Sequence, residues 1–216
     1  TLVASHTSPD RHFEQFTSQL FQEEMTGSTL NMHYTIADPK TFGISEYEPV
    51  LPIYHSGQPE DRKEHCSDLL HRLDRIDPDR LSPENAYTYR LLHRSLENDL
   101  ALADFPYYNE PLSPSSGMQS QLPVLLAEYT FRTKRDVTDY LALLDQIDDY
   151  FASLLLYEQE KAAAGFFMPA CSSEKVRKQC DTIVTTEELA QGTHFLQTTF
   201  EDRLSELQKQ GLFTPE

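Results

Sequence analysis

The feature that most constrains this chain is a long apolar repeat between Asp136 and Ala164. Apolar residues recur there at helical steps that stay close to a heptad for about eight turns. They are Val137, Leu141, Leu144, Ile147, Phe151, Leu154 and Leu155. A strand would alternate at every second residue, so the repeat predicts one long heptad-like helix near 136–164, ended by Gly165.

The same spacing returns in four further segments. These are Phe13, Phe16 and Leu20; Cys66, Leu69, Leu73 and Ile76; Tyr89, Leu92, Leu96, Leu100 and Ala103; and Leu196, Phe200, Leu204 and Leu207. The chain has only 7 glycines, too few for the many tight turns of a sandwich or barrel. We therefore predict an all-α fold, an irregular bundle or array of about six to eight helices in a single helical domain over residues 1–216.

Capping residues and prolines locate the ends of several helices. Ser8 and Ser82 each stand before a proline, as expected where a helix starts, and Thr185-x-x-Glu188 resembles a capping box. Four prolines make residues 38–59 a connection between helices. A second proline-rich stretch, 105–123, predicts a long loop followed by a short helix through 124–129.

Charge and hydropathy exclude some classes of partner. The net charge of −17 repels phosphate backbones and anionic lipid surfaces, so we expect no nucleic-acid partner. No run approaches the roughly 20 apolar residues of a membrane span, and residues 1–10 lack the pattern of a signal peptide. The chain begins with Thr1 rather than methionine, which suits a trimmed N-terminus.

The eight histidines raise the question of zinc. A helical zinc protease needs His-Glu-x-x-His, which places two imidazoles on one face, but no histidine here is followed by glutamate. His65 and His71 lie in the densest group of potential ligands. They are six positions apart, about 600° of helix rotation, and so point away from each other. We expect a solvated helix face there, and no metal ligand.

The sequence also lacks the common motifs of a nucleophilic active site. The chain has no Gly-x-Ser-x-Gly motif and no phosphate-binding glycine-rich loop. Cys171 and Cys180 lie among basic residues, which lower a thiol pKa. Nine positions apart on one helix, they face opposite sides, too far apart for a disulfide. The pair could close only if Cys171 lies in a bend before the helix. We expect Cys180 to be buried on a stripe with Val176 and Ile183.

Several long stretches, taken in order, resemble one family. They are HFEQFTSQLFQEEM, TLNMHYTIADPKTFGI, LHRLDRIDPDRLSPENAYTYRLLHRSLENDL, SSGMQSQLPVLLAEYTFRTKRDVTDYLALLDQIDDYF and GFFMPACSSEKVRKQC. Their order and spacing resemble the N-terminal portion of the bacterial domain-of-unknown-function 885 proteins. The most telling pieces are the Gly-x-x-x-x-Leu-Pro stretch at 117–123, the DVTDYLALL helix, and the step from Gly165 to Pro169.

The resemblance carries several expectations. That family looks like zinc metallopeptidases of the gluzincin type, whose metal motif lies in a C-terminal portion that nothing here matches. It implies that this chain is an N-terminal fragment without catalytic or metal residues, and that zinc belongs to the full-length parent. Its partners would be the C-terminal remainder of the parent and a peptide substrate. Family members are often exported or lipid-anchored, which is the location the resemblance implies.

We thus expect a helical region that forms one wall of a substrate cleft, reached by a loop over 115–123 containing Ser116, Gly117 and Gln119. The plain alternative for that loop is an ordinary proline-rich connection. The alternative for the whole chain is a non-catalytic helical interaction or scaffold module. A third reading is a thiol sensor that uses Cys171 and Cys180.

Overall fold

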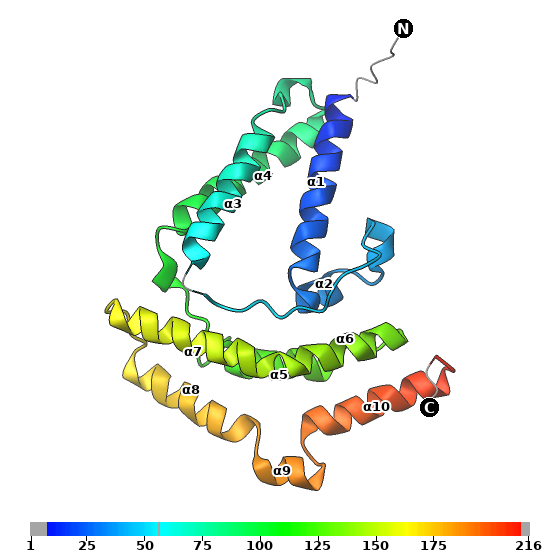
Figure 1. Cartoon of the computed structure of the whole chain (residues 1–216), viewed down its shortest axis with the longest axis vertical. Helices are drawn as coiled ribbons and strands as arrows, with labels where there is room; N and C mark the ends of the chain where they lie inside the picture. Colours follow the sequence, from blue (N-terminus) through cyan, green and yellow to red (C-terminus); the bar gives the residue numbers. More distant parts are fainter. Residues whose placement is uncertain (1–7, 56, 213–216) are drawn as a thin grey trace. The chain divides into compact units, whose positions relative to one another are not determined.

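The structure is a computed structural model that describes residues 8–55 and 57–212. Across these residues it contains α-helices, three short 3-10 helices and no strand, which confirms the all-α prediction (Figure 1). The α-helices are α1 (Pro9–Thr26), α2 (Thr29–Thr35), α3 (Gln58–Leu73), α4 (Pro83–Leu102), α5 (Met118–Glu128), α6 (Lys134–Asp145), α7 (Ile147–Ala163), α8 (Ala170–Ile183), α9 (Thr186–Gln191) and α10 (Phe195–Lys209). The 3-10 helices are Pro39–Phe42, Pro78–Arg80 and Pro106–Tyr108.

Side-chain caps explain where several helices begin. The Ser8 and Ser82 hydroxyls accept backbone N–H groups in the first turns of α1 and α4, so both predicted starts are confirmed. Thr185 caps α9 in the same way. At α6, Thr133 and Asp136 bond each other's backbone N–H groups in a complete capping box. These polar residues satisfy donors that the first turn of a helix leaves free.

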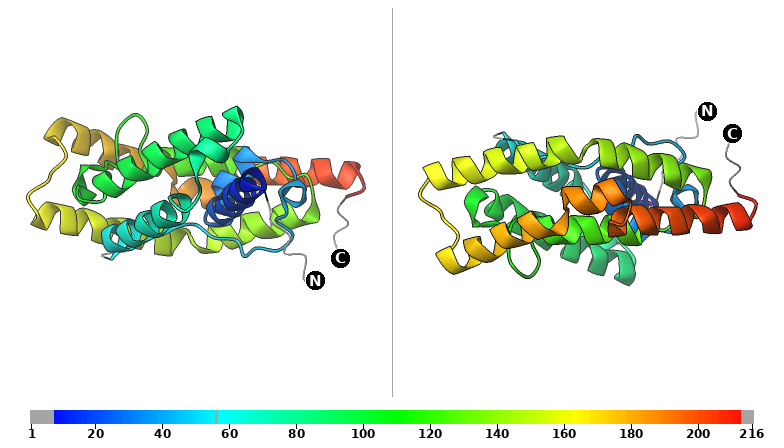
Figure 2. Two further views of the ribbon diagram at one scale, coloured as in Figure 1. Left: turned by 90° about the horizontal axis from the view of Figure 1, so that it is seen from above. Right: turned by 90° about the horizontal axis from the view of Figure 1, so that it is seen from below.

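The predicted helix over 136–164 is divided at Gln146. The helices α6 and α7 follow one another along nearly the same line, as Figures 1 and 2 show. The Gln146 amide donates to Ala142 O at 3.0 Å and to Pro49 O at 3.0 Å. The tie to Pro49 comes from a distant part of the sequence, so a local repeat does not reveal it. This division, with the short helices α2 and α9, gives ten α-helices in the described residues instead of six to eight.

The chain forms two compact units. The first comprises Thr1–Gly27, Asp38–Tyr47 and Tyr54–Tyr108, and the second comprises Ser28–Ala37, Glu48–Ile53 and Asn109–Glu216. Both units are therefore discontinuous in sequence.

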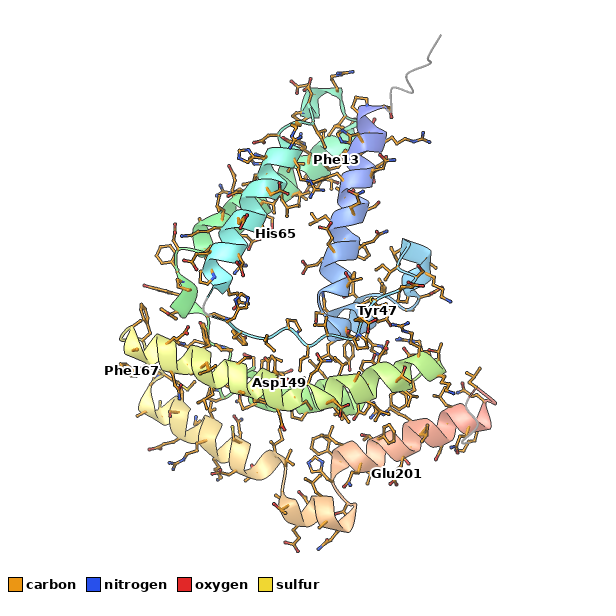
Figure 3. The ribbon with its side chains drawn as sticks, viewed as in Figure 1. Phe13, Tyr47, His65, Asp149, Phe167 and Glu201 are labelled. Atoms are coloured by element: carbon orange, nitrogen blue, oxygen red, sulfur yellow. The ribbon has the colours of Figure 1, made fainter. Side chains whose placement is uncertain are left out.

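The first unit is a small helical core made by α1, α3 and α4. The stripes predicted for these helices converge on one apolar cluster of Phe13, Phe16, Leu69, Leu73, Ile76, Tyr89 and Leu96. The Phe13 ring lies 6.1 Å from that of Tyr89, on the side of α1 that faces α4 (Figure 3). At about 25 cal/mol per Å² of apolar area buried, such a cluster supplies the main stabilisation of the unit.

The second unit contains α5 to α10 together with two short pieces from early in the chain. We call residues 28–37, which include α2, and residues 48–53 the N-terminal strap. Thr29 and Val50 bond each other, and the Gln146 side chain holds Pro49 O and Leu51 N–H. On the other side of the strap, the Tyr34 hydroxyl donates to Leu125 O at 2.6 Å.

An arginine joins α10 to the end of α5. The Arg203 guanidinium lies over the rings of Phe131 and Tyr140, at 4.6 and 4.9 Å from their centroids. It also donates to Leu126 O and Tyr129 O, carbonyls at the C-terminus of α5 that have no helical partner. Arg203 thus caps α5 while its flat face stacks on aromatic rings.

Candidate functional site

The structure places the three predicted site residues around the start of α5. Ser116 is exposed in a turn, Gly117 is the N-cap, and Gln119 lies in the first helical turn with 3% of its surface exposed. The predicted loop over 115–123 is therefore a turn followed by a helix, and its continuation to Pro123 is wrong. Gly117 ends the loop by capping the helix, and Pro123 lies within α5, whose buried face continues through it.

Two glutamines, Gln119 and Gln179, bind the backbone of the turn at residues 113–116. The Gln119 amide donates to Ser113 O at 2.6 Å and to Gln179 Oε1 at 2.9 Å. Gln179, from α8, donates in turn to Pro114 O at 2.9 Å. This chain of hydrogen bonds fixes residues 113 and 114 against both α5 and α8, so the turn is held from two helices.

The turn itself is closed by serine and backbone contacts. Ser116 N–H donates to Ser113 Oγ at 3.2 Å, and the two hydroxyls lie 3.2 Å apart. Gly117 must be glycine because a Cβ there would overlap Gln119 Oε1 and the Ser113 backbone, with Ser113 O at 2.6 Å. The close approach of Gly117 to Ser113 is what lets Gln119 reach beneath the turn.

A buried lysine holds the start of the same segment. Lys161, on α7, is 1% exposed. Its ammonium lies 2.8 Å from Glu110 Oε2 and donates to Asn109 O at 3.0 Å. The Tyr157 hydroxyl also donates to Asn109 O, at 3.3 Å. We call residues 109–119 the anchored segment, because side chains of α5, α7 and α8 bind its backbone.

Glu158 is a carboxyl near this anchor whose pKa is raised. Burial raises its pKa, the Lys161 charge opposes that rise, and Glu110 adds to it. Glu158 Oε1 and Gln119 Oε1 are buried and accept no hydrogen bond from the described residues. A buried acceptor without a partner costs stability, so each of these two oxygens would be stabilised by a hydrogen-bond donor placed beside it.

Three further residues near the turn, Lys161, Gln179 and Glu158, were not predicted from the sequence. For Lys161 a signal exists, because it follows the buried Leu154 by seven residues and so shares its helix face. A long side chain with a charged end passes for a surface residue on such a stripe. Gln179 and Glu158 carry no comparable signal, since their roles depend on segments distant in sequence.

The histidines of the described residues do not gather into a metal site. His65 and His71 are exposed on α3, and Figure 3 shows His65 on the ribbon of that helix. His33 and His194 are buried, each with a backbone hydrogen bond of its own. Over residues 8–55 and 57–212, no three His, Cys, Asp or Glu side chains are placed to hold a metal ion. The zinc that the family resemblance implies does not fit these residues.

The cysteines are free and separate. Cys171 and Cys180 are both exposed on α8, so the prediction that Cys180 is buried is wrong. Of the expected stripe, Val176 alone is buried where α8 packs against α5. The pKa of the Cys180 thiol is raised by partial burial and by Asp181, which makes it a poorer nucleophile.

These features define an all-α protein of two helical units that presents a polar, anchored turn and has no metal cluster in its described part. A family model described as "Bacterial protein of unknown function (DUF885)" matches residues 40–212, and the chain belongs to that family. No curated protein and no solved structure matches it. None of the helices within the described residues is long and apolar enough to span a membrane.

Proposed function

We propose that this chain is the helical N-terminal region of a larger zinc-metallopeptidase-like protein, where it forms a wall of the substrate cleft. The chain belongs to the DUF885 family, and the resemblance of that family to gluzincin-type enzymes supports this role. In this proposal the zinc and the catalytic residues belong to the parent protein outside this chain. The same resemblance supports an exported or lipid-anchored location for the parent.

The observation that carries the proposal is the exposed turn at Ser115 and Ser116 on a rigid base. Binding loses less entropy when the contacting groups are already ordered. Here Ser113 and Pro114 are fixed by Gln119 and Gln179, while the serines next to them stay exposed. Ser116 would contact a peptide, and Gly117 and Gln119 would set the position of the turn.

An exposed apolar face on α4 of the first unit also supports the proposal that this chain packs against another part of a larger protein. Tyr87, Leu91 and Leu102 on α4 are each more than half exposed. Tyr87 and Leu91 are four residues apart and lie on one face, opposite the helix's own buried stripe. An uncovered apolar helix face is expected where another part of a larger protein packs.

The experiment is to express the parent protein and measure peptide hydrolysis with Ser116→Tyr. A bulky ring in the turn should raise KM about fivefold, the effect of losing about 1 kcal/mol of binding, with kcat little changed. Ser205→Tyr, at an exposed serine of α10, is the matched control and should leave KM unchanged. Equal KM values for both variants would show that the turn does not contact the substrate.

The chain alone should not hydrolyse peptides, with or without added zinc. Turnover by the chain that a chelator abolishes would contradict the proposal. The alternative role as a helical interaction module is separated by the gene downstream of Glu216. A His/Glu zinc motif there supports the enzyme region, and a stop codon directly after Glu216 supports the module.

A further inference from the structure

His33 is a buried titratable residue of the second unit, and it is not one of the residues that bind the anchored segment. It lies on α2 and is 8% exposed. Its ring stacks on Tyr129 with centroids 3.6 Å apart, and its Nε2 accepts the Thr130 N–H at 3.1 Å. His33 therefore ties the strap to the connection between α5 and α6.

This hydrogen bond requires a neutral ring. Nε2 can accept only if its lone pair is free, so the proton is on Nδ1, which faces Asp136 Oδ1 at 3.9 Å. Asp136 already accepts the N–H groups of Arg132 and Thr133 as part of the α6 cap. Both of these hydrogen bonds use Oδ2 of Asp136, and Oδ1 is the oxygen that faces His33.

The charges around His33 come from each element packed on it. Arg132 before α6 and Arg203 on α10 disfavour a positive charge on the His33 ring, while Asp136 favours it. Burial is the largest effect, and together these lower the pKa of His33 to about 4. Beside it on α2, burial and then Glu128 raise the pKa of Tyr34, which stays neutral in the acidic range.

We propose that the N-terminal strap is released by acid, and that protonation of His33 at Nε2 is the event that releases it. The added proton occupies the lone pair that accepts Thr130 N–H, so two donors then face each other. The cation would also be buried beside Arg132 and Arg203. The other polar ties, Tyr34 to Leu125 O and Gln146 to Pro49 and Leu51, are neutral hydrogen bonds worth about 1 kcal/mol each. The buried apolar side chains of the strap, Leu30, Met32, Ile36 and Leu51, do not titrate and oppose its release at every pH.

The direction follows from linkage. A released His33 has the ordinary pKa of about 6.5, above its docked value, so the released strap binds the proton more readily. Docking is at full strength above about pH 6.5 and weakens as the pH falls toward 4. At pH 5 the ratio of released to docked strap should be about thirtyfold higher than at pH 7.5.

Amide hydrogen exchange on the whole chain, corrected for the intrinsic effect of pH, measures this ratio. Protection of residues 29–36 should fall about thirtyfold from pH 7.5 to pH 5, while the amides of α7 change little. His33→Gln keeps an acceptor for Thr130 N–H without titrating and should flatten the dependence. His12→Gln, at an exposed histidine of α1, is the control and should behave as the unmodified chain.

The same pH dependence in His33→Gln would overturn the proposal. If that variant fails to fold, ring nitrogen chemical shifts of His33 in the unmodified chain decide instead. A neutral ring with its proton on Nδ1 at pH 5.5, in the docked strap, is the expected result. A docked, protonated His33 at that pH, paired with Asp136, would overturn it.

Discussion

The two units of this molecule are stabilised in different ways. The buried polar and charged side chains of the described residues are Thr29, His33, Gln119, Asp139, Ser153, Lys161 and His194, and all of them belong to the second unit. The described part of the first unit is instead built on an apolar cluster of three helices. A buried polar group costs stability unless it is paired, so it persists where it holds a particular geometry. In the second unit that geometry includes the strap and the anchored segment.

The largest effect is expected in the apolar core of the first unit. Leu73 is fully buried, and Leu73→Ala should lower the free energy of unfolding by about 2–5 kcal/mol through lost apolar contact and a cavity. Leu73→Met keeps the volume and should cost less than about 1.5 kcal/mol. Urea unfolding measures both. If the two variants cost the same, stability there does not depend on filled volume, and the contrast between the units fails.

The second largest effect tests the close approach under the anchored turn. Gly117→Ala forces a Cβ into the Ser113 backbone and should cost about 1–3 kcal/mol. Gly27→Ala in the first unit is the control. Gly27 has a helical φ of −69° and a nearest atom, Glu23 O, at 3.3 Å, so a much smaller change is expected. Thermal unfolding of both variants measures the difference, and a neutral Gly117→Ala would show that the turn adapts.

A smaller effect is expected from the buried ammonium. Lys161→Met keeps most of the side-chain volume but leaves Asn109 O without its charged donor, which should cost about 1–2 kcal/mol. Glu110 is half exposed and returns to water, which limits the loss. Lys209→Met, at an exposed lysine of α10, should leave the urea midpoint unchanged. If Lys161→Met instead stabilises the chain, the ion pair serves only to orient the segment.

The smallest effect concerns the thiols. Alkylation of Cys171 and Cys180 should proceed in the folded chain without changing stability, because both are exposed. Cys66 in the first unit is buried, and burial raises the pKa of its thiol, so it should react only on unfolding. Mass spectrometry after a timed exposure to iodoacetamide separates the three. Rapid reaction at Cys180 at neutral pH would revive the thiol-sensor hypothesis.

The first unit could largely be predicted from sequence. The stripes through Phe13, Leu69 and Tyr89 meet in one core, and the cap at Ser82 begins α4 as expected. Periodicity and capping are local signals, and this unit depends mainly on them.

The second unit could be predicted only in part. The apolar repeat predicted the helices α6 and α7. It did not predict that Gln146, at the break between them, bonds to Pro49, or that the buried His33 bonds to Thr130. Of the three predicted site residues, Gln119 has a buried anchoring role that a loop assignment did not foresee. Pairings this far apart leave no periodic trace in a single sequence.

The position of the strap in the sequence affects the order in which the two units can assemble during synthesis. Thr130 follows His33 by 97 residues, and Gln146 follows Pro49 by the same number. At about 5–20 residues per second, the strap spends roughly 5 to 20 s outside the ribosome before its partners emerge. The helices α3 and α4 of the first unit are synthesised within that interval, and α1 is synthesised before it. The earliest part of the second unit is therefore among the last to reach its place. A break in synthesis between residues 54 and 108 leaves it without Thr130 and Gln146 to bind.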